Sequence, residues 1–200
     1  MKGSIAIIIL AAGSSSRLGQ PKQLLQYNNK SLLQHVVSQV MSLQNILPLL
    51  VLGSSKQIIE KDVEDLNIEI VHNDDWQLGM STSIKAGLSA ALKKNKNLQA
   101  VMFVVCDQPF ITTDLLNEMI QTFMRSDKGI IAASYAETFG TPMLFAEKYF
   151  NQLLQFQNDE GAKKVAIQNK NDLAVVPFNE GEIDIDTMDA YQKLLSNENI

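Results

Sequence analysis

The chain has 200 residues, of which 46% are hydrophobic, and its formal net charge is −5 at pH 7. This negative charge argues against binding to nucleic acid, which depends on neutralising phosphates. No apolar run reaches membrane-spanning length, and the amino terminus lacks the extended apolar region of a signal peptide, so no membrane association is expected. Cys106 is the single cysteine, which fits a reducing compartment. We therefore expect a cytoplasmic protein with one domain spanning residues 1–200.

Short apolar runs alternate along the chain with longer stretches of helical period. Strands are expected at 5–10, 47–53, 68–73, 100–107, 129–134, 140–146, 172–178 and 182–186. Helices are expected at 31–43, beginning at an N-cap Ser31, and at 54–66, 81–94, 112–126, 147–156, 160–169 and 187–197. This order predicts an α/β fold with a mostly parallel sheet covered by helices on both faces. Ligands of such sheets bind at the carboxyl ends of strands, which selects the segments after Leu10, Val71 and Val105 and around residues 183–186.

The first selected segment is LAAGSSSRLGQPKQLL, residues 10–25. Three small residues leave their backbone amides uncovered, and successive amides can form an anion-binding nest. Three serines then add hydroxyl donors, Arg17 offers a planar fork of donors, and Lys22 offers a compact point charge. The combination predicts phosphate binding, although the spacing fits neither a P-loop nor a dinucleotide fingerprint. The alternative is a solvated surface loop with incidental charges.

Two further strand ends carry polar groups. Asn73 ends one strand, and the next helix begins at Ser81 or Ser83, where free backbone amides can meet an anion or a base carbonyl. Asp107 ends the most apolar strand, and a carboxylate there is a natural ligand for Mg²⁺. A plain turn with a serine cap, and an aspartate acting as a turn or cap residue, are the alternatives. Cys106 precedes Asp107, so its side chain is expected to point to the opposite face and to pack.

The segment EIDIDTMDAY, residues 182–191, places Asp184 and Asp186 at alternate positions. As a strand it would turn both carboxylates to one face, where one of them could complete a magnesium site with Asp107. Asp186 is the preferred second ligand, with Asp184 kept open. The alternative is an acidic edge strand followed by a helix cap.

The pattern L-A-A-G-x-S-x-R-x-G-x-P-K-x-L-L resembles the signature loop of the nucleotidyltransferases of the molybdenum cofactor family, particularly its cytidylyl-transferring members. N-x(5)-G-x(3)-S, CDQP and DIDT resemble three further segments of that family, in the same order along the chain. The resemblance implies a Rossmann-like, three-layer α/β/α nucleotidyltransferase fold whose loop wraps the triphosphate of an NTP. The alanine at position 12 is the form associated with CTP, whereas glycine there is associated with GTP.

The resemblance also implies roles for individual residues. The implied catalytic residues are Arg17, Lys22 and Asp107. The implied ligands of a Mg²⁺ cofactor are Asp107 and Asp186. Nucleotide contacts are implied for Leu10, Ala11, Ala12, Gly13, Ser14, Ser15, Arg17, Lys22, Asn73, Gly79, Met80, Ser81 and Ser83.

The activity implied is transfer of CMP from CTP to the molybdenum–pterin cofactor, with release of pyrophosphate. A xanthine-dehydrogenase-type molybdoenzyme or its chaperone is the partner implied. Three positions depart from the family's acceptor segments: Thr141 replaces His, and Asn158 and Lys163 replace Gly and Arg. Another phosphorylated acceptor, such as a sugar phosphate or methylerythritol phosphate, therefore stays open. A non-catalytic chaperone that inserts the cofactor also stays open. An oxidoreductase is a further alternative, but the chain has no dinucleotide fingerprint to support it.

Overall fold

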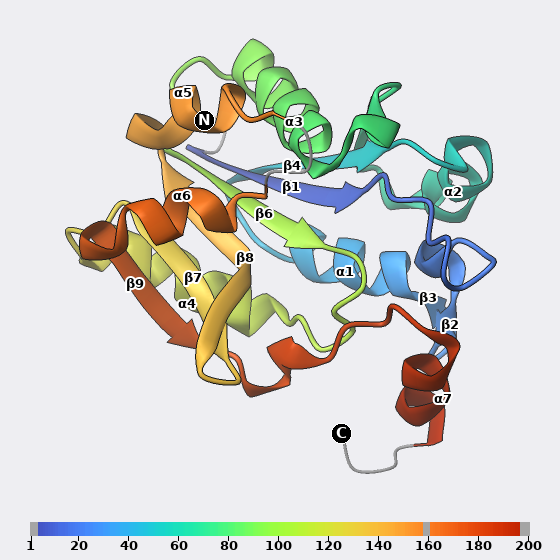
Figure 1. Ribbon diagram of the computed structural model, residues 1–200. Coiled ribbons are helices and arrows are strands. Elements are labelled where there is room, and N and C mark those ends of the chain that lie inside the picture. Colours follow the sequence, from blue (N-terminus) through green and yellow to red (C-terminus); the bar gives the residue numbers. More distant parts are fainter. Residues whose placement is uncertain (1–3, 158–160, 197–200) are drawn as a thin grey trace.

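The computed structural model describes residues 4–157 and 161–196. Its centre is a seven-stranded sheet with the strand order β5-β4-β1-β6-β8-β7-β9 (Figure 1). The strands are β1 (Ile5–Ala11), β4 (Ile46–Leu52), β5 (Glu69–His72), β6 (Ala100–Val105), β7 (Ile130–Tyr135), β8 (Thr138–Ala146) and β9 (Leu173–Pro177). Only β8 runs antiparallel to its neighbours; the other pairings in the sheet are parallel. The expected mostly parallel sheet is confirmed.

Helices cover both faces of this sheet, which gives the expected three layers (Figure 1). The helices are α1 (Leu32–Met41), α2 (Lys56–Val63), α3 (Met80–Lys94), α4 (Thr113–Arg125), α5 (Phe150–Leu154), α6 (Lys163–Gln168) and α7 (Met188–Ser196). Helices α1, α2 and α4 pack into one apolar core, and α3, α5 and α6 into the other. None of the helices described is both long enough and apolar enough to span a bilayer.

Strand β1 shows why its sequence is so apolar. Ile5, Ile7 and Ile9 face the α1/α2/α4 core, whereas Ile8 and Leu10 face the α3/α5/α6 core. A central parallel strand has no solvated face, so its residues form one continuous hydrophobic run. Each fully buried isoleucine contributes roughly 1.5–3 kcal/mol relative to an exposed one. The burial fixes the strand that carries the loop after Leu10 at the centre of the sheet.

Helix α1 begins at its expected N-cap. The Ser31 hydroxyl accepts a hydrogen bond from the Gln34 backbone amide at 3.0 Å, and the Ser31 amide donates to the Gln34 side chain at 3.0 Å. This reciprocal capping box satisfies two amides that would otherwise lack partners. The Ser31 hydroxyl also donates to the Asp62 carboxylate at 2.5 Å, which ties α1 to α2.

The expected strand at residues 182–186 is wrong. Asn179–Glu182 form a 3-10 turn, and residues 183–186 have no regular structure. One backbone bond, from the Ile185 amide to the Asp107 carbonyl at 3.0 Å, takes the place of a ladder. Gly181, inside that turn, sits so close to Tyr135 that a Cβ there would lie 2.3 Å from the ring. Of the expected helix at 160–169, residues 163–168 form α6; residues 158–160 lie outside the described residues.

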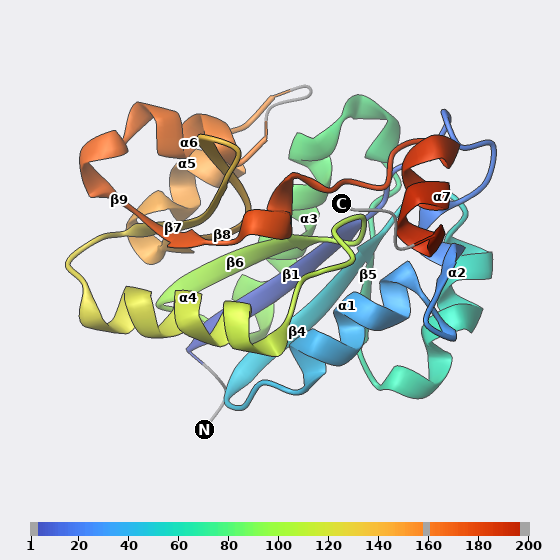
Figure 2. The same ribbon diagram turned by 90° about the horizontal axis from the view of Figure 1, so that it is seen from below.

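The last helix returns to the loop that follows β1 (Figure 2). Leu194 of α7 and Ile185 join Leu18, Leu25 and Leu32 in a third apolar cluster. The Tyr191 hydroxyl donates to the Gln26 carbonyl at 2.7 Å. These contacts bring residues near 186 against residues near 20, a juxtaposition that decides the geometry of the site below.

Candidate active site

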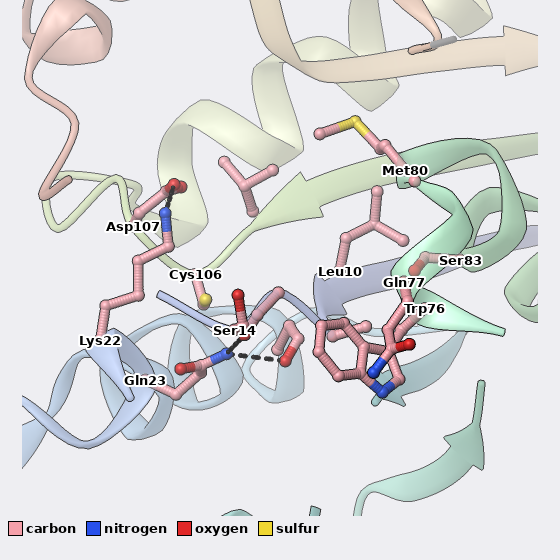
Figure 3. Close-up of a pocket in the computed structure, with 15 residues that line it drawn as sticks. Leu10, Ser14, Lys22, Gln23, Trp76, Gln77, Met80, Ser83, Cys106 and Asp107 are labelled. Atoms are coloured by element: carbon pink, nitrogen blue, oxygen red, sulfur yellow. Dashed lines mark hydrogen bonds and ion pairs between the residues drawn. The ribbon is translucent and has the colours of Figure 1, made fainter. Parts of the chain in front are cut away.

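The cavity that holds most of the predicted site residues, hereafter the main cavity, opens where β1 and β6 end and α3 begins, at the carboxyl edge predicted to bind a ligand. It has a volume of about 370 Å³ and is lined by Leu10, Ala11, Ala12, Gly13, Ser14, Lys22, Gln23, Trp76, Gln77, Gly79, Met80, Ser83, Val105, Cys106 and Asp107. Figure 3 shows Lys22 and Asp107 on one side and Trp76, Gln77, Met80 and Ser83 on the other. The cavity therefore has a charged end and a largely apolar end.

A buried side chain, that of Gln23, shapes the loop after β1. Its amide nitrogen donates to the carbonyls of Ala11 at 2.9 Å and Gly13 at 3.0 Å (Figure 3). The Ser15 hydroxyl accepts from the Lys22 backbone amide at 3.0 Å and lies 3.4 Å from the Gln23 side-chain oxygen. The two bonds to Ala11 and Gly13 tie the small residues of the loop to Gln23. Sequence reasoning missed Gln23; the signal available was a glutamine placed between Lys22 and an apolar pair.

The charged end is a linked set of ion pairs. The Lys22 ammonium pairs with the carboxylates of Asp107 and of Asp186, the latter at 2.7 Å. Arg17 reaches the other Asp186 oxygen at 2.8 Å. Burial acts to lower the pKa of Lys22, but Asp107 and then Asp186 outweigh it and raise that pKa. The hydrogen bond from Lys22 lowers the pKa of Asp186. Lys22 and Asp186 are thus both charged at neutral pH.

The carboxylates at this end fit a divalent cation. The Asp107 Oδ1 atom is buried and has no hydrogen-bond partner among the described residues. Burial, followed by the nearby Asp107 and Asp186, raises the pKa of Asp184 to about 6. Within residues 4–157 and 161–196, no group of three or more His, Cys, Asp or Glu is arranged to hold a metal. Mg²⁺ commonly takes one or two protein carboxylates and completes its shell with phosphates and water, so Asp107 and Asp186 suit it.

The other end of the cavity is built at the start of α3. Asn73 is buried and donates to the Thr82 hydroxyl at 2.8 Å and the Ser83 hydroxyl at 2.9 Å. Gly79 has φ 105°, a conformation that favours glycine, and directs the chain into the helix. The two hydrogen bonds from Asn73 thus hold Thr82 and Ser83, and with them the first turn of α3, in place.

The structure brings most predicted nucleotide contacts together. Ten of the predicted residues line the main cavity: Leu10, Ala11, Ala12, Gly13, Ser14, Lys22, Gly79, Met80, Ser83 and Asp107. Ser15, Arg17 and Asp186 line an adjoining cavity of about 130 Å³, which shares Gly13 and Lys22. Asn73 and Ser81 are buried beside the main cavity and are not among its lining residues.

Sequence reasoning missed Trp76, Gln77 and Val105 as lining residues. It gave Cys106 a packing role, and Cys106 is buried in the α1/α2/α4 core while its side chain also borders the cavity. Burial, aided by Asp107, raises the pKa of the Cys106 thiol to about 12, so the thiol stays neutral. A neutral buried thiol is a poor nucleophile.

A second group of polar residues lies beyond Asp107, where the hairpin β7–β8 meets the 3-10 turn η6 (Asn179–Glu182). The Gln108 amide donates to the Gly181 carbonyl at 2.7 Å, which ties the end of β6 to the segment that carries Asp184 and Asp186. Burial, then Asp184, raises the pKa of Tyr135, while Gln108 and Thr141 act to lower it. Thr141 therefore lies beside Tyr135.

The α/β fold thus brings a loop of small residues, two cations and a strand-end carboxylate together at two adjoining cavities on one edge of the sheet. The chain matches the family described as the MobA-like NTP transferase domain over residues 7–173, and it belongs to that family.

Similar proteins extend this result. The bifunctional protein GlmU of Francisella philomiragia is 30% identical over 148 residues, which is 73% of this chain and 31% of that protein. The chain thus spans about a third of the length of the curated relatives it matches. The crystal structure of the homologue of Mycobacterium tuberculosis Rv0371c from Mycobacterium sp. strain JC1 has a TM-score of 0.84 and 26% identity, and the match covers 98% of each chain.

Three more distant structures share the fold. The manganese complex of Rv0371c from Mycobacterium tuberculosis has a TM-score of 0.75 at 24% identity, covering 96% of this chain and 98% of that one. Molybdopterin-guanine dinucleotide biosynthesis protein A from Archaeoglobus fulgidus gives 0.69 at 15% identity, covering 96% and 97%. The complex of CMP:2-keto-3-deoxy-manno-octonic acid synthetase with CTP gives 0.74 at 12% identity, covering 97% and 99%.

Proposed function

We propose that the protein transfers CMP from CTP to a phosphate of the molybdenum–pterin cofactor and releases pyrophosphate. The observation that carries this proposal is the division of the main cavity into a charged end with Lys22 and Asp107 and an apolar end with Trp76 and Met80. A nucleoside triphosphate is divided in the same way, into an anionic tail and a flat base.

The two cations hold the triphosphate in this proposal. Arg17 is 70% exposed in its side chain, so its ion pair with Asp186 is weak and easily exchanged for a phosphate oxygen. Lys22 is largely buried, and its raised pKa keeps it protonated. Both groups stabilise the negative charge that gathers on the departing pyrophosphate. The amides that follow Leu10 are held in place by Gln23 and contribute neutral donors.

The reaction needs no protein nucleophile. A phosphate oxygen of the acceptor forms a bond to the α-phosphorus, and the bond from that phosphorus to the bridging oxygen of the β-phosphate breaks. The electron pair leaves with pyrophosphate. The protein's contribution is to hold acceptor and nucleotide in line and to supply fixed positive charge.

Asp107 and Asp186 would hold Mg²⁺ in this site, and the unpartnered Oδ1 of Asp107 supports that assignment. When bound, Mg²⁺ acts as a Lewis acid on the phosphate oxygens. The manganese complex of Rv0371c is a fold neighbour with a divalent metal, which supports the proposal.

The choice of CTP rests on Ala12, which lines the cavity, and is supported by the CTP complex of a fold neighbour. The choice of a molybdenum–pterin acceptor rests on the family and on the molybdopterin-related neighbour. A xanthine-dehydrogenase-type enzyme or its chaperone would receive the product. The buried free thiol of Cys106 fits the cytoplasmic location proposed with this function.

The direct test offers each NTP with Mg²⁺ and one acceptor at a time: the molybdenum cofactor, a sugar phosphate and methylerythritol phosphate. Pyrophosphate is measured. We expect release with CTP and the molybdenum cofactor. If pyrophosphate is released only with another acceptor, that acceptor replaces the molybdenum cofactor in the proposed reaction. If it is released only with GTP, GTP replaces CTP as the nucleotide. Cofactor binding without pyrophosphate from any pair would support an insertion chaperone instead.

A further inference from the structure

Trp76 is the only tryptophan of the chain, and it lies in the 3-10 turn η3 (Trp76–Leu78), between the end of β5 and the start of α3. Its side chain is half-buried and borders the main cavity on the side opposite Lys22 (Figure 3).

The indole has backbone directly behind it. A methyl group on Gly53 would lie 2.6 Å from Trp76 Cβ, 2.7 Å from its Cγ and 2.9 Å from Ala12 Cβ. These separations are closer than packed carbon atoms tolerate, so the residue at position 53 has to be glycine for Trp76 to pack there. The Trp76 side chain also packs against the α3/α5/α6 core. The stem of the Trp76 side chain therefore lies directly against Gly53, which holds the residue at the edge of the cavity.

The cavity residues beside Trp76 carry no charge, which suits a base better than a phosphate. Leu10 and Met80 border the same part of the cavity, whereas the paired cations Lys22 and Arg17 lie at the charged end. Aromatic rings offer large flat contact area, and a base stacked on one gains roughly 1–3 kcal/mol. With the triphosphate at Lys22, the base of the same molecule points toward Trp76.

We propose that the Trp76 indole contacts the base of the bound nucleotide and limits the space for it, so that a pyrimidine is favoured over a purine. This inference rests on the proposed function only in taking a nucleoside triphosphate as the ligand. It does not depend on the transfer step or on the acceptor.

The single tryptophan makes the contact directly observable. The full-length protein is titrated with CTP, GTP and inorganic tripolyphosphate while tryptophan emission is recorded, and calorimetry measures binding in parallel. We expect a saturable change of emission with CTP at the concentrations where calorimetry detects binding. Tripolyphosphate is expected to bind with little change of emission, because it has no base.

Equal emission changes with CTP and tripolyphosphate would overturn the base contact, as would CTP binding with no change at all. Binding of none of the nucleotides would overturn it too. A clear CTP response in a protein that releases no pyrophosphate would instead overturn the transfer reaction and leave the Trp76 contact standing.

Three variants sharpen the test, with binding measured by calorimetry and folding by circular dichroism. Trp76→Ala should weaken CTP binding roughly tenfold or more, leave tripolyphosphate within about twofold, and narrow the preference for CTP over GTP. Trp76→Phe should restore most of the CTP affinity and keeps the test valid if the alanine variant does not fold. Leu78→Ala is the matched control: Leu78 lies in the same turn, is 65% exposed and is not a cavity residue. Unchanged CTP binding in Trp76→Ala would overturn the proposal.

Discussion

Lys22 and Asp186 lie 164 positions apart in the sequence, and the Lys22 ammonium nitrogen is 2.7 Å from the Asp186 carboxylate. The same ammonium also pairs with Asp107 at the end of β6. This contact joins the loop after β1, the end of β6 and the segment before α7 into one charged cluster. In the proposed reaction the cluster separates: Lys22 turns to the phosphates, and the carboxylates become free to bind a cation.

Replacing Lys22 with methionine should reduce nucleotidyl transfer at least about 100-fold, because it removes the buried charge that stabilises the leaving pyrophosphate. The measurement is kcat/KM from pyrophosphate release, with circular dichroism as a check on folding. Lys30→Met is the matched control, since Lys30 is exposed and contacts only the Ser38 hydroxyl, at 3.4 Å, among the interactions described for it. A Lys22→Met protein that keeps activity within about threefold would contradict the assigned role.

Gln23→Leu should destabilise the fold by about 1–3 kcal/mol, because the Ala11 and Gly13 carbonyls lose their donor. It should also raise the KM for CTP, since the loop would lose the two side-chain bonds that hold it in place. Urea unfolding gives the first quantity and initial rates give the second. Gln26→Leu serves as control: Gln26 is exposed and its amide makes a 3.2 Å bond to the Leu24 carbonyl. Equal stabilities of the two variants would rule out the proposed function of Gln23.

Asp186→Asn should raise the Mg²⁺ concentration needed for half-maximal activity at least about tenfold, and Asp184→Asn should have a smaller effect. The reason is that Asp186 lies at the charged end of the site, where it pairs with Arg17 and Lys22. Burial and the neighbouring carboxylates instead raise the pKa of Asp184. Mn²⁺ binding, followed by its paramagnetic resonance signal, gives a second readout that does not require turnover. The reverse order of effects would make Asp184 the second ligand.

Asp172 links β9 to the turn before α5, and it should make stability depend on acid pH. It accepts a hydrogen bond from the Tyr149 hydroxyl and pairs with Lys148 at 2.7 Å. Burial acts to raise the pKa of Asp172, but Lys148 and Tyr149 outweigh it and the pKa is lowered from its ordinary 3.8. A lowered pKa in the folded state adds stability that is present above pH 3.8 and is lost as pH falls through the lowered value.

The measurement is the free energy of unfolding of Asp172→Asn and of the unmodified chain at pH 7, 5 and 3. The variant should be less stable by about 1–2 kcal/mol at pH 7 and 5, and the gap should shrink at pH 3. Asp127→Asn is the control, because the Asp127 side chain is 91% exposed and its nearest cation lies 3.9 Å away. A gap that stays constant down to pH 3 would contradict the role of the Asp172 charge.

Most of the fold could be predicted from the sequence because most of its signals are local. The run from Ile5 to Leu10 has the length and β-branching of a buried strand, and the structure confirms it as the central β1. Ser31 caps α1 through contacts within three residues. Strand ends in a parallel sheet fall on one edge, which is why the loop after Leu10 and the carboxylate of Asp107 could be expected at one site.

Features that depend on distant partners were not predictable. The alternation in EIDID suggested a strand, but Gly181 packs against Tyr135, and a single bond from Ile185 to the Asp107 carbonyl replaces the ladder. Gln23 carries no local signal, because its amide bonds to the Ala11 and Gly13 carbonyls only once the loop has folded. Trp76 became a cavity wall only because Gly53 leaves room for its indole.

The sequence by itself determined the alternation of strands and helices, the loop of small residues with two cations, and the membership of the MobA-like NTP transferase family. Hydrophobic period and fixed motif spacing are properties of neighbouring residues, so they can be read along the chain. Only the tertiary structure decided that Lys22 pairs with both Asp107 and Asp186, and that Trp76 lies across the cavity from Lys22 and Asp107. Those relations depend on how packing brings remote segments to the same sheet edge, which no local pattern encodes.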